Sequence, residues 1–94
     1  MQVAETIRRQ INAIDRMAFA AWGAKHFVVN DRSLTFSTSG SVRWKGKVTI
    51  KLNERDLYDV RFTKLGRYLD IKEDVVHTDV FVEGLVQLID GKVG

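Results

Sequence analysis

The strongest candidate for chemistry in this sequence is a short basic segment around a tryptophan, at residues 43–47. Arginine and lysine side chains pair with phosphate groups, and an indole ring can stack on a nucleobase. Further cations follow along the chain at positions that we expect to share the open face of a sheet. We therefore predict one binding surface, which consists of Arg43, Trp44, Lys45, Lys47, Lys51, Arg61 and Lys64.

The sequence leaves two questions about this basic surface open. Strands that face water often carry lysine and arginine, since such charges prevent pairing with other chains, and Glu54 and Asp59 would neutralise part of the positive charge. Trp44 is either an anchor for a partner, because tryptophan is enriched at binding hot spots, or a ring folded back onto the edge of the core. None of these alternatives gives the segment a catalytic role.

No set of residues in the sequence has the spacing of a metal or catalytic site. A metal site needs three or four converging ligands, and His77 with Glu73 at helical spacing supplies at most two. His26 is expected at the edge of a strand, and the chain has no cysteine. The serines lack the context of a nucleophile elbow, and the chain has no glycine-rich phosphate loop. We therefore expect no enzymatic activity, no metal and no cofactor.

The placement of the basic residues depends on a predicted β-hairpin over residues 47–64. Apolar and polar residues alternate on both sides of a polar break that begins at Asn53, which is typical of two strands with one buried face. A slip of one residue would expose one apolar set, so the pattern fixes the register. The predicted pairs are Val48–Phe62, Ile50–Val60 and Leu52–Tyr58 on the buried face, and Thr49–Arg61 and Lys51–Asp59 on the wet face.

The first part of the chain is predicted as a helix and two strands. Apolar residues recur every three or four positions from Gln2 to about Trp22, which indicates one amphipathic helix. Gly23 is placed to end this helix as a C-terminal cap. Residues 25–29 and 34–38 are expected as strands that precede the hairpin.

The end of the chain is predicted as a helix that begins near Asp70 or Asp74. Its basis is a four-residue repeat, although β-branched residues are frequent there, at Val76, Val80, Gly84 and Leu88. Two amphipathic helices can together cover one face of an antiparallel sheet. We therefore predict an α+β fold of a single domain, residues 1–94, in which an N-terminal and a C-terminal helix pack on one face of a meander of about four strands.

Length and composition limit the class of protein. Ninety-four residues with 45% hydrophobic content suffice for one modest core. The net charge of +3 permits nucleic acid or an acidic protein surface as a partner, and argues against an acidic DNA mimic. We find neither a signal peptide nor an apolar run long enough to cross a membrane. We therefore expect no membrane partner, and the absence of cysteine fits a reducing cytoplasm.

Four motifs in order along the chain carry a resemblance to a known family. They are GAKHF at 23–27, LTF at 34–36, VTIKLN at 48–53 and DLYDVRF at 56–62. The sequence resembles a family of short, uncharacterised proteins encoded by phages and other mobile elements. The family pattern also ends in Thr-Gly-Leu, where this chain has Glu83-Gly84-Leu85. The family has no established catalytic residues, so the resemblance transfers none.

The resemblance implies a setting in which small proteins act by binding host machinery, as anti-CRISPR proteins do. We expect a non-catalytic phage or mobile-element protein, in the cytoplasm of the bacterial host, that binds and inhibits a nucleoprotein defence complex such as a CRISPR effector. One alternative is a small nucleic-acid-binding module that uses the same basic face. Another is a structural accessory protein that self-associates through an exposed strand edge or Trp44. The identity of the partner and the oligomeric state stay open.

Overall fold

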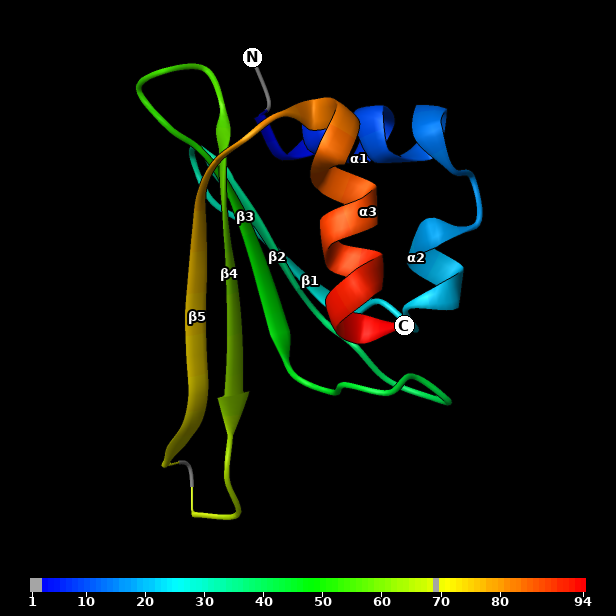
Figure 1. Ribbon diagram of the computed structural model, residues 1–94, viewed down its shortest axis with the longest axis vertical. Coiled ribbons are helices and arrows are strands. Elements are labelled where there is room, and N and C mark those ends of the chain that lie inside the picture. Colours follow the sequence, from blue (N-terminus) through cyan, green and yellow to red (C-terminus); the bar gives the residue numbers. More distant parts are fainter. Residues whose placement is uncertain (1–2, 69) are drawn as a thin grey trace.

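The protein is an antiparallel sheet with its helices on one side (Figure 1). The computed structural model describes residues 3–68 and 70–94. The five strands pair in sequence order, which makes the sheet a meander. In the described part of the chain, no helix has the length and apolar character that crossing a membrane requires. The elements are α1 (Val3–Ile14), α2 (Ala18–Ala21), β1 (Lys25–Val29), β2 (Ser33–Ser37), β3 (Lys47–Leu52), β4 (Tyr58–Leu65), β5 (Ile71–Val80) and α3 (Val82–Val93).

The predicted α+β class is confirmed, and so is the register of the β3–β4 hairpin. The observed pairs are Val48–Phe62, Thr49–Arg61, Ile50–Val60, Lys51–Asp59 and Leu52–Tyr58. The turn that joins the two strands is organised by Asn53, whose Oδ1 accepts hydrogen bonds from the backbone N–H groups of Arg55 (2.8 Å) and Leu57 (3.2 Å). The alternating pattern and this turn together set which side chains face the helices.

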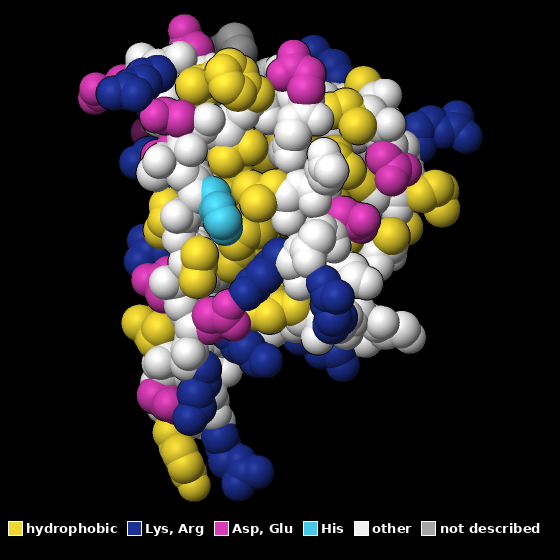
Figure 2. Space-filling model, in the orientation of Figure 1, with side chains coloured by type: hydrophobic (Ala, Val, Ile, Leu, Met, Phe, Trp, Pro, Cys, Tyr) yellow, Lys and Arg dark blue, Asp and Glu magenta, His cyan; other side chains and the backbone are white. Residues whose placement is uncertain are grey.

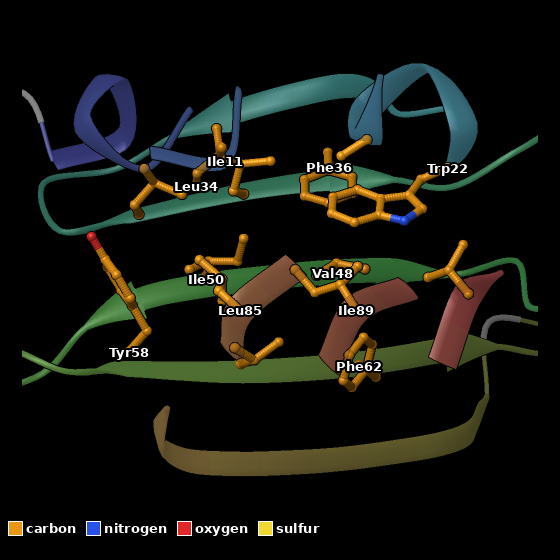
Figure 3. Packing of buried hydrophobic residues seen from close by; sticks show 14 of the residues in the cluster. Ile11, Trp22, Leu34, Phe36, Val48, Ile50, Tyr58, Phe62, Leu85 and Ile89 are labelled. Atoms are coloured by element: carbon orange, nitrogen blue, oxygen red, sulfur yellow. The ribbon is translucent and has the colours of Figure 1, made fainter. Parts of the chain in front are cut away.

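The buried face of the sheet and the helices form one hydrophobic core. Its fully buried members come from α1, β2, β3, β4 and α3, among them Ile7, Ile11, Leu34, Phe36, Val48, Ile50, Val60, Phe62, Leu85 and Ile89. At one end of the core the ring of Trp22 stacks on Phe36, with centroids 6.0 Å apart (Figure 3). The indole N–H of Trp22 donates to Oδ1 of Asp90 in α3 at 3.2 Å. Trp22 therefore links the α2 segment to both the sheet and α3.

The single N-terminal helix that the pattern predicts is two helices, and its first predicted residue, Gln2, lies outside the described residues. Asp15 causes the break, because its Oδ1 accepts from the N–H of Met17 (3.0 Å) and its carbonyl accepts from the N–H of Ala18 (3.2 Å). Aspartate competes in this way with the backbone bonds of a helix interior. Ile14 and Met17 are consequently 48% and 65% exposed, outside the buried stripe.

The C-terminal helix begins later than predicted, because residues 71–80 form a fifth strand, β5. The four-residue repeat was misleading, since it spans the junction between β5 and α3. The β-branched residues of this stretch favour a strand, and β5 pairs with β4 from Leu65–Ile71 to Tyr58–Val80. The sheet therefore has five strands rather than about four, and His77 lies on a strand rather than on a helix.

Gly23 follows α2 as the predicted cap, and only glycine fits there. Its φ is +60°, and its N–H donates to the carbonyl of Ala20 at 3.1 Å, while the N–H of Ala24 donates to that of Phe19 at 3.0 Å. Both bonds are typical of a helix C-terminus that ends in a left-handed residue. A Cβ atom at this position would overlap the carbonyl oxygen of Ser39.

Gly23→Ala is therefore expected to lower the free energy of unfolding by about 3 kcal/mol, because left-handed strain and steric overlap act together. Gly40→Ala is the matched control, since Gly40 has φ +81° but a Cβ there meets nothing within 4 Å. We expect it to cost about 1 kcal/mol, for strain alone. Urea unfolding of both variants measures the difference, and equal losses would contradict the overlap at Gly23.

Candidate binding surface

One face of the sheet, called the outer face from here on, is covered by none of the described helices and is largely polar. Residues that lie opposite each other in neighbouring strands share a face, so the pairing identifies its members. They are Lys25, Val28, Ser33, Thr35, Ser37, Lys47, Thr49, Lys51, Asp59, Arg61, Thr63, Asp74 and Val76. The hydroxyls of Thr35 and Thr49 are hydrogen-bonded across β2 and β3 at 3.0 Å. Ser33 is only 8% exposed, whereas the other hydroxyl residues are half-buried, so the outer face presents hydroxyl groups together with cations.

Three exposed lysines give the outer face its positive charge. Lys25 and Lys47 lie in one row across the sheet, because both pair with Ser37, and two strand spacings separate them by about 10 Å. Lys51 follows Lys47 by four residues, about 13 Å along β3. Within residues 3–68 and 70–94, none of the three forms an ion pair. Their charges are therefore available to an anionic partner.

Arg61 also lies on the outer face, as predicted, but its charge is already paired. Its Nε and Nη2 donate to the two carboxylate oxygens of Asp74 at 2.7 and 2.6 Å. These hydrogen bonds raise the pKa of Arg61 and lower the pKa of Asp74. The pair ties β4 to β5, and it leaves Arg61 less available to a partner than the three lysines.

The loop before β3 faces the end of α3 instead of the outer face. Trp44 is only 7% exposed, and its indole N–H donates to Oε1 of Glu73 at 3.0 Å. Nη2 of Arg43 donates to the carbonyl of Gly91 at 2.6 Å, and the N–H groups of Arg43 and Trp44 both point to the carbonyl of Val93. These carbonyls belong to the last turn of α3, which a helix leaves unsatisfied. Of the two alternatives for Trp44, the structure has the ring folded onto the core.

The predicted seven-residue surface is therefore divided in two. Lys47, Lys51 and Arg61 share the outer face, whereas Arg43 and Trp44 form hydrogen bonds to the last turn of α3. Lys45 is exposed within the same loop as Trp44. Lys64 lies opposite Glu73 and two residues from the buried Phe62, so alternation places it on the side of the helices. The prediction of one continuous stripe is wrong, because it assigned the loop and Lys64 to the same face as the strand lysines.

Glu73 is the acidic residue of a cluster around the end of α3 that also contains Trp44 and Lys92. Lys92 forms an ion pair with it, and the Lys92 Nζ lies 5.4 Å from the centroid of the Trp44 ring. Hydrogen bonds from Lys92 and then from Trp44 lower the pKa of Glu73, with a smaller contribution from the charge of Lys64. The cluster connects β5, the loop before β3 and α3. Its interactions therefore stabilise the packing of these three segments.

The β4–β5 hairpin extends past the rest of the sheet (Figure 1) and carries residues that the sequence prediction missed. Pairing of β3 with β4 ends at Lys47–Thr63, whereas β4 and β5 continue to Leu65–Ile71. Hydrophobic and basic side chains lie together at this projecting end (Figure 2). Its exposed members are Lys64, Leu65, Arg67, Tyr68, Ile71 and Lys72, with Tyr68 at 85% exposure. Lys64 was among the predicted residues. The other five were missed, because the sequence analysis predicted a helix from Asp70 onward instead of a strand that pairs with β4.

A shallow groove of about 500 Å³ opens at the opposite end of the outer face, beside Lys51. Residues of the β3–β4 turn and of β5 line it. Its charges are of both signs and are partly paired, since Nη1 of Arg55 lies 3.0 Å from Oδ2 of Asp79, and Asn53 Nδ2 donates to Oδ1 of Asp79 at 2.9 Å. The groove therefore adds polar contacts to the outer face without adding a strong net charge.

The described residues contain no group of three or more histidine, cysteine, aspartate or glutamate side chains that could hold a metal ion. His77 packs edge-on against Phe62, with ring centroids 5.9 Å apart. His26 lies on the edge strand β1, where it was expected. Asp70, Glu73 and Asp74 are engaged with cations.

Comparison with known proteins does not identify a family. No protein-family model, curated protein or solved structure matched the chain. The resemblance to mobile-element proteins is carried by the four sequence motifs alone, and it stays a prediction. The case for a function therefore depends on the surfaces described above.

Glu73→Gln is expected to destabilise the fold at neutral pH and to weaken its dependence on acid. The pKa of Glu73 is lowered on folding. Its contribution to stability is therefore fully present above the unfolded-state pKa, and it is lost as the pH falls through the folded-state pKa. Chemical unfolding between neutral and strongly acidic pH measures this difference.

The control for this pH series is Glu54→Gln, which removes a carboxylate from the exposed β3–β4 turn. We expect this variant to retain the acid dependence of the wild type. If Glu73→Gln also retained that dependence, the pKa of Glu73 would not be lowered on folding, which would contradict the stabilisation of its charged form by Lys92 and Trp44.

Proposed function

We propose that the protein is a non-catalytic phage or mobile-element protein that places its outer face on a bacterial nucleoprotein defence complex and inhibits it. The observation that supports this proposal most is a sheet face that the described helices leave uncovered. On it, Lys25, Lys47 and Lys51 lie among hydroxyl side chains and form no ion pair with any described residue. Lysines attract phosphates and carboxylates over long range, and hydroxyl groups hydrogen-bond to phosphate oxygens.

The spacing of the lysines favours a macromolecular partner over a small ligand. Small-molecule sites are enclosed and concave, whereas these charges lie about 10 Å apart across the sheet and about 13 Å apart along a strand. An RNA-guided effector carries phosphates of guide and target strands in and around a channel. A basic surface that occupied part of this region would block the entry of target DNA. The mobile-element setting comes from the resemblance of the sequence motifs.

The projecting end of the β4–β5 hairpin extends the proposed contact. Arg67 adds positive charge, whereas the charge of Lys72 is paired with Asp70 at 3.3 Å. Tyr68 is an exposed aromatic ring at 85% exposure. Tyrosine and arginine are enriched among the residues that dominate binding energy. We infer that this end reaches into the partner while the lysines of the outer face lie against its surface.

Direct binding of nucleic acid is the second candidate, and the same three lysines favour it. A protein that neutralises phosphates releases counterions, so its affinity falls with salt in proportion to the number of contacts. Three lysine contacts on duplex DNA would give a slope of about −3 in a plot of log affinity against log salt. Inhibition of a nucleoprotein without measurable binding to bare nucleic acid separates the first candidate from the second.

The double variant Lys47→Glu/Lys51→Glu tests the proposal. Purified guide-loaded CRISPR effectors of several types are titrated with the protein, and their binding of cognate target DNA is measured. We expect the wild type to block at least one effector, and the double variant to need a concentration at least about tenfold higher, because two attractive charges become repulsive. The same titrations with bare duplex DNA and RNA at several salt concentrations test the second candidate.

The matched control is Arg9→Glu/Arg16→Glu, which makes the same change of charge on exposed positions of the helical side. It is expected to inhibit like the wild type. Equal effects of the two double variants would show that net charge matters and the outer face does not. Failure of the wild type to affect any effector would overturn the inhibitor function.

Tyr68→Ala is expected to weaken the inhibition by about tenfold, as loss of an exposed aromatic anchor does. Its free energy of unfolding should change by less than about 0.5 kcal/mol, because the side chain is not part of the core. Met17→Ala removes a side chain of 65% exposure from the helical side as a control. Undiminished inhibition by Tyr68→Ala would exclude the projecting end from the contact.

A further inference from the structure

One edge of β5, the side away from β4, is not paired with any described strand. β5 has ten residues, stands last in the strand order and, within the described part of the chain, pairs with β4 on one side only. A strand in this position presents unpaired N–H and C=O groups along its free side. Apolar side chains are exposed along it, with Ile71 at 65%, Val76 at 49% and Val75 at 38%. Such an edge is a template for pairing with another strand.

The other edge of the sheet is less suited to pairing. β1 has five residues, and its register with β2 shifts between Lys25 and Val28. His26, within this irregularity, has φ +56°. Bulges and short length are features that protect an edge strand from pairing. Of the two edges, β5 is therefore the one open to a partner strand.

The regular part of β5 has a definite centre. Its pairing with β4 is irregular at both ends, between Tyr58 and Val60 and again between Lys64 and Leu65. Between these irregularities the strand runs evenly from Glu73 to His77, and Val75 is the middle residue. A pairing that uses the regular stretch most fully is therefore centred on Val75.

Side-chain charges favour the same centre for two copies of β5 that pair antiparallel. Opposed residues in such a pair share a face, so a two-fold axis perpendicular to the sheet must set one residue of β5 opposite its own copy. The axis passes midway between these two copies and is named here by that residue. An axis through Val75 sets Glu73 opposite His77 and Asp74 opposite Val76, with no like charges opposed. An axis through Asp74 opposes two aspartates, and an axis through Val76 sets Glu73 opposite Asp79. Like charges directly opposite destabilise a strand pair.

We propose that the partner of this edge is a second copy of the chain, paired antiparallel along β5 about a two-fold axis at Val75. The two five-stranded sheets then become one continuous sheet, with the helices of both copies on the same side. The outer faces become neighbours, which doubles the area and the number of lysines that one assembly presents. This inference stands on the edge and its charge pattern, and it does not depend on the proposed inhibitor function.

Single cysteines test the register, since the natural chain contains none. Val75→Cys brings two thiols opposite each other at the axis, where cross-strand Cβ atoms are about 5 Å apart. Val76→Cys is the matched control, because Val76 is the more exposed of the two but would lie diagonally from its symmetry mate, about 7–8 Å away. Under mild oxidation, we expect disulfide-linked dimers of Val75→Cys to form severalfold faster. Equal or faster cross-linking of Val76→Cys would overturn the register.

Sedimentation of the uncross-linked protein tests the association itself. The wild type is expected to shift from monomer to dimer as its concentration rises. Val75→Lys, which sets two ammonium groups side by side at the axis, is expected to stay monomeric, while Val28→Lys on the other edge should dimerise like the wild type. Circular dichroism confirms that both variants are folded. A wild type that stays monomeric up to the highest soluble concentration would overturn the proposal.

Discussion

The alternation of apolar and polar residues in β2, β3 and β4 is the constraint on which the rest of the structure depends. It gives the sheet one face that must leave water and one that must stay in it. The fully buried residues Leu34, Phe36, Ile50 and Phe62 lie on the first face, and α1, α2 and α3 all pack there. Because the described helices occupy that side, they leave the polar face uncovered. The proposed binding surface therefore follows from the packing of the helices on the apolar face.

The edge strand β5 is held differently from the central strands. Little of it is buried, and its side-chain bonds to the body are polar: Glu73 accepts from Trp44 and Lys92, and Asp74 accepts from Arg61. Charge-assisted hydrogen bonds of this kind position a strand without covering it with apolar side chains. They keep β5 in register while its free side stays open.

The sequence predicts the parts of the fold that local pattern determines. The hairpin register follows from the alternation of apolar and polar residues. The position of Gly23 after a helical pattern correctly predicts a C-terminal cap in the left-handed conformation. The helix break at Asp15 and the strand β5 were not predicted, because a helical repeat of apolar residues continues through both segments. The side-chain bond of Asp15 and the pairing of β5 with β4 determine the structure of these segments, and a period read along the sequence represents neither contact.

The membership of the outer face was likewise predicted only in part. Lys47 and Lys51 were found because strand alternation assigns them to the wet face. Trp44 was placed on that surface because its own neighbours are basic, whereas its position depends on Glu73 and Lys92, which are far away in sequence. Lys25 was missed, because the irregular pairing near His26 hides the alternation that would have assigned it to the same row as Lys47.

The central claim is that the protein acts through the uncovered face of its sheet. Lysine-specific labelling, followed by mass spectrometry of the free protein and of its complex with an effector that it inhibits, tests this most directly. The account predicts that Lys25, Lys47 and Lys51 react more slowly in the complex, while Lys92, packed against Trp44 on the helical side, reacts at an unchanged rate. Unchanged labelling of all three outer-face lysines in a saturated complex would contradict the account.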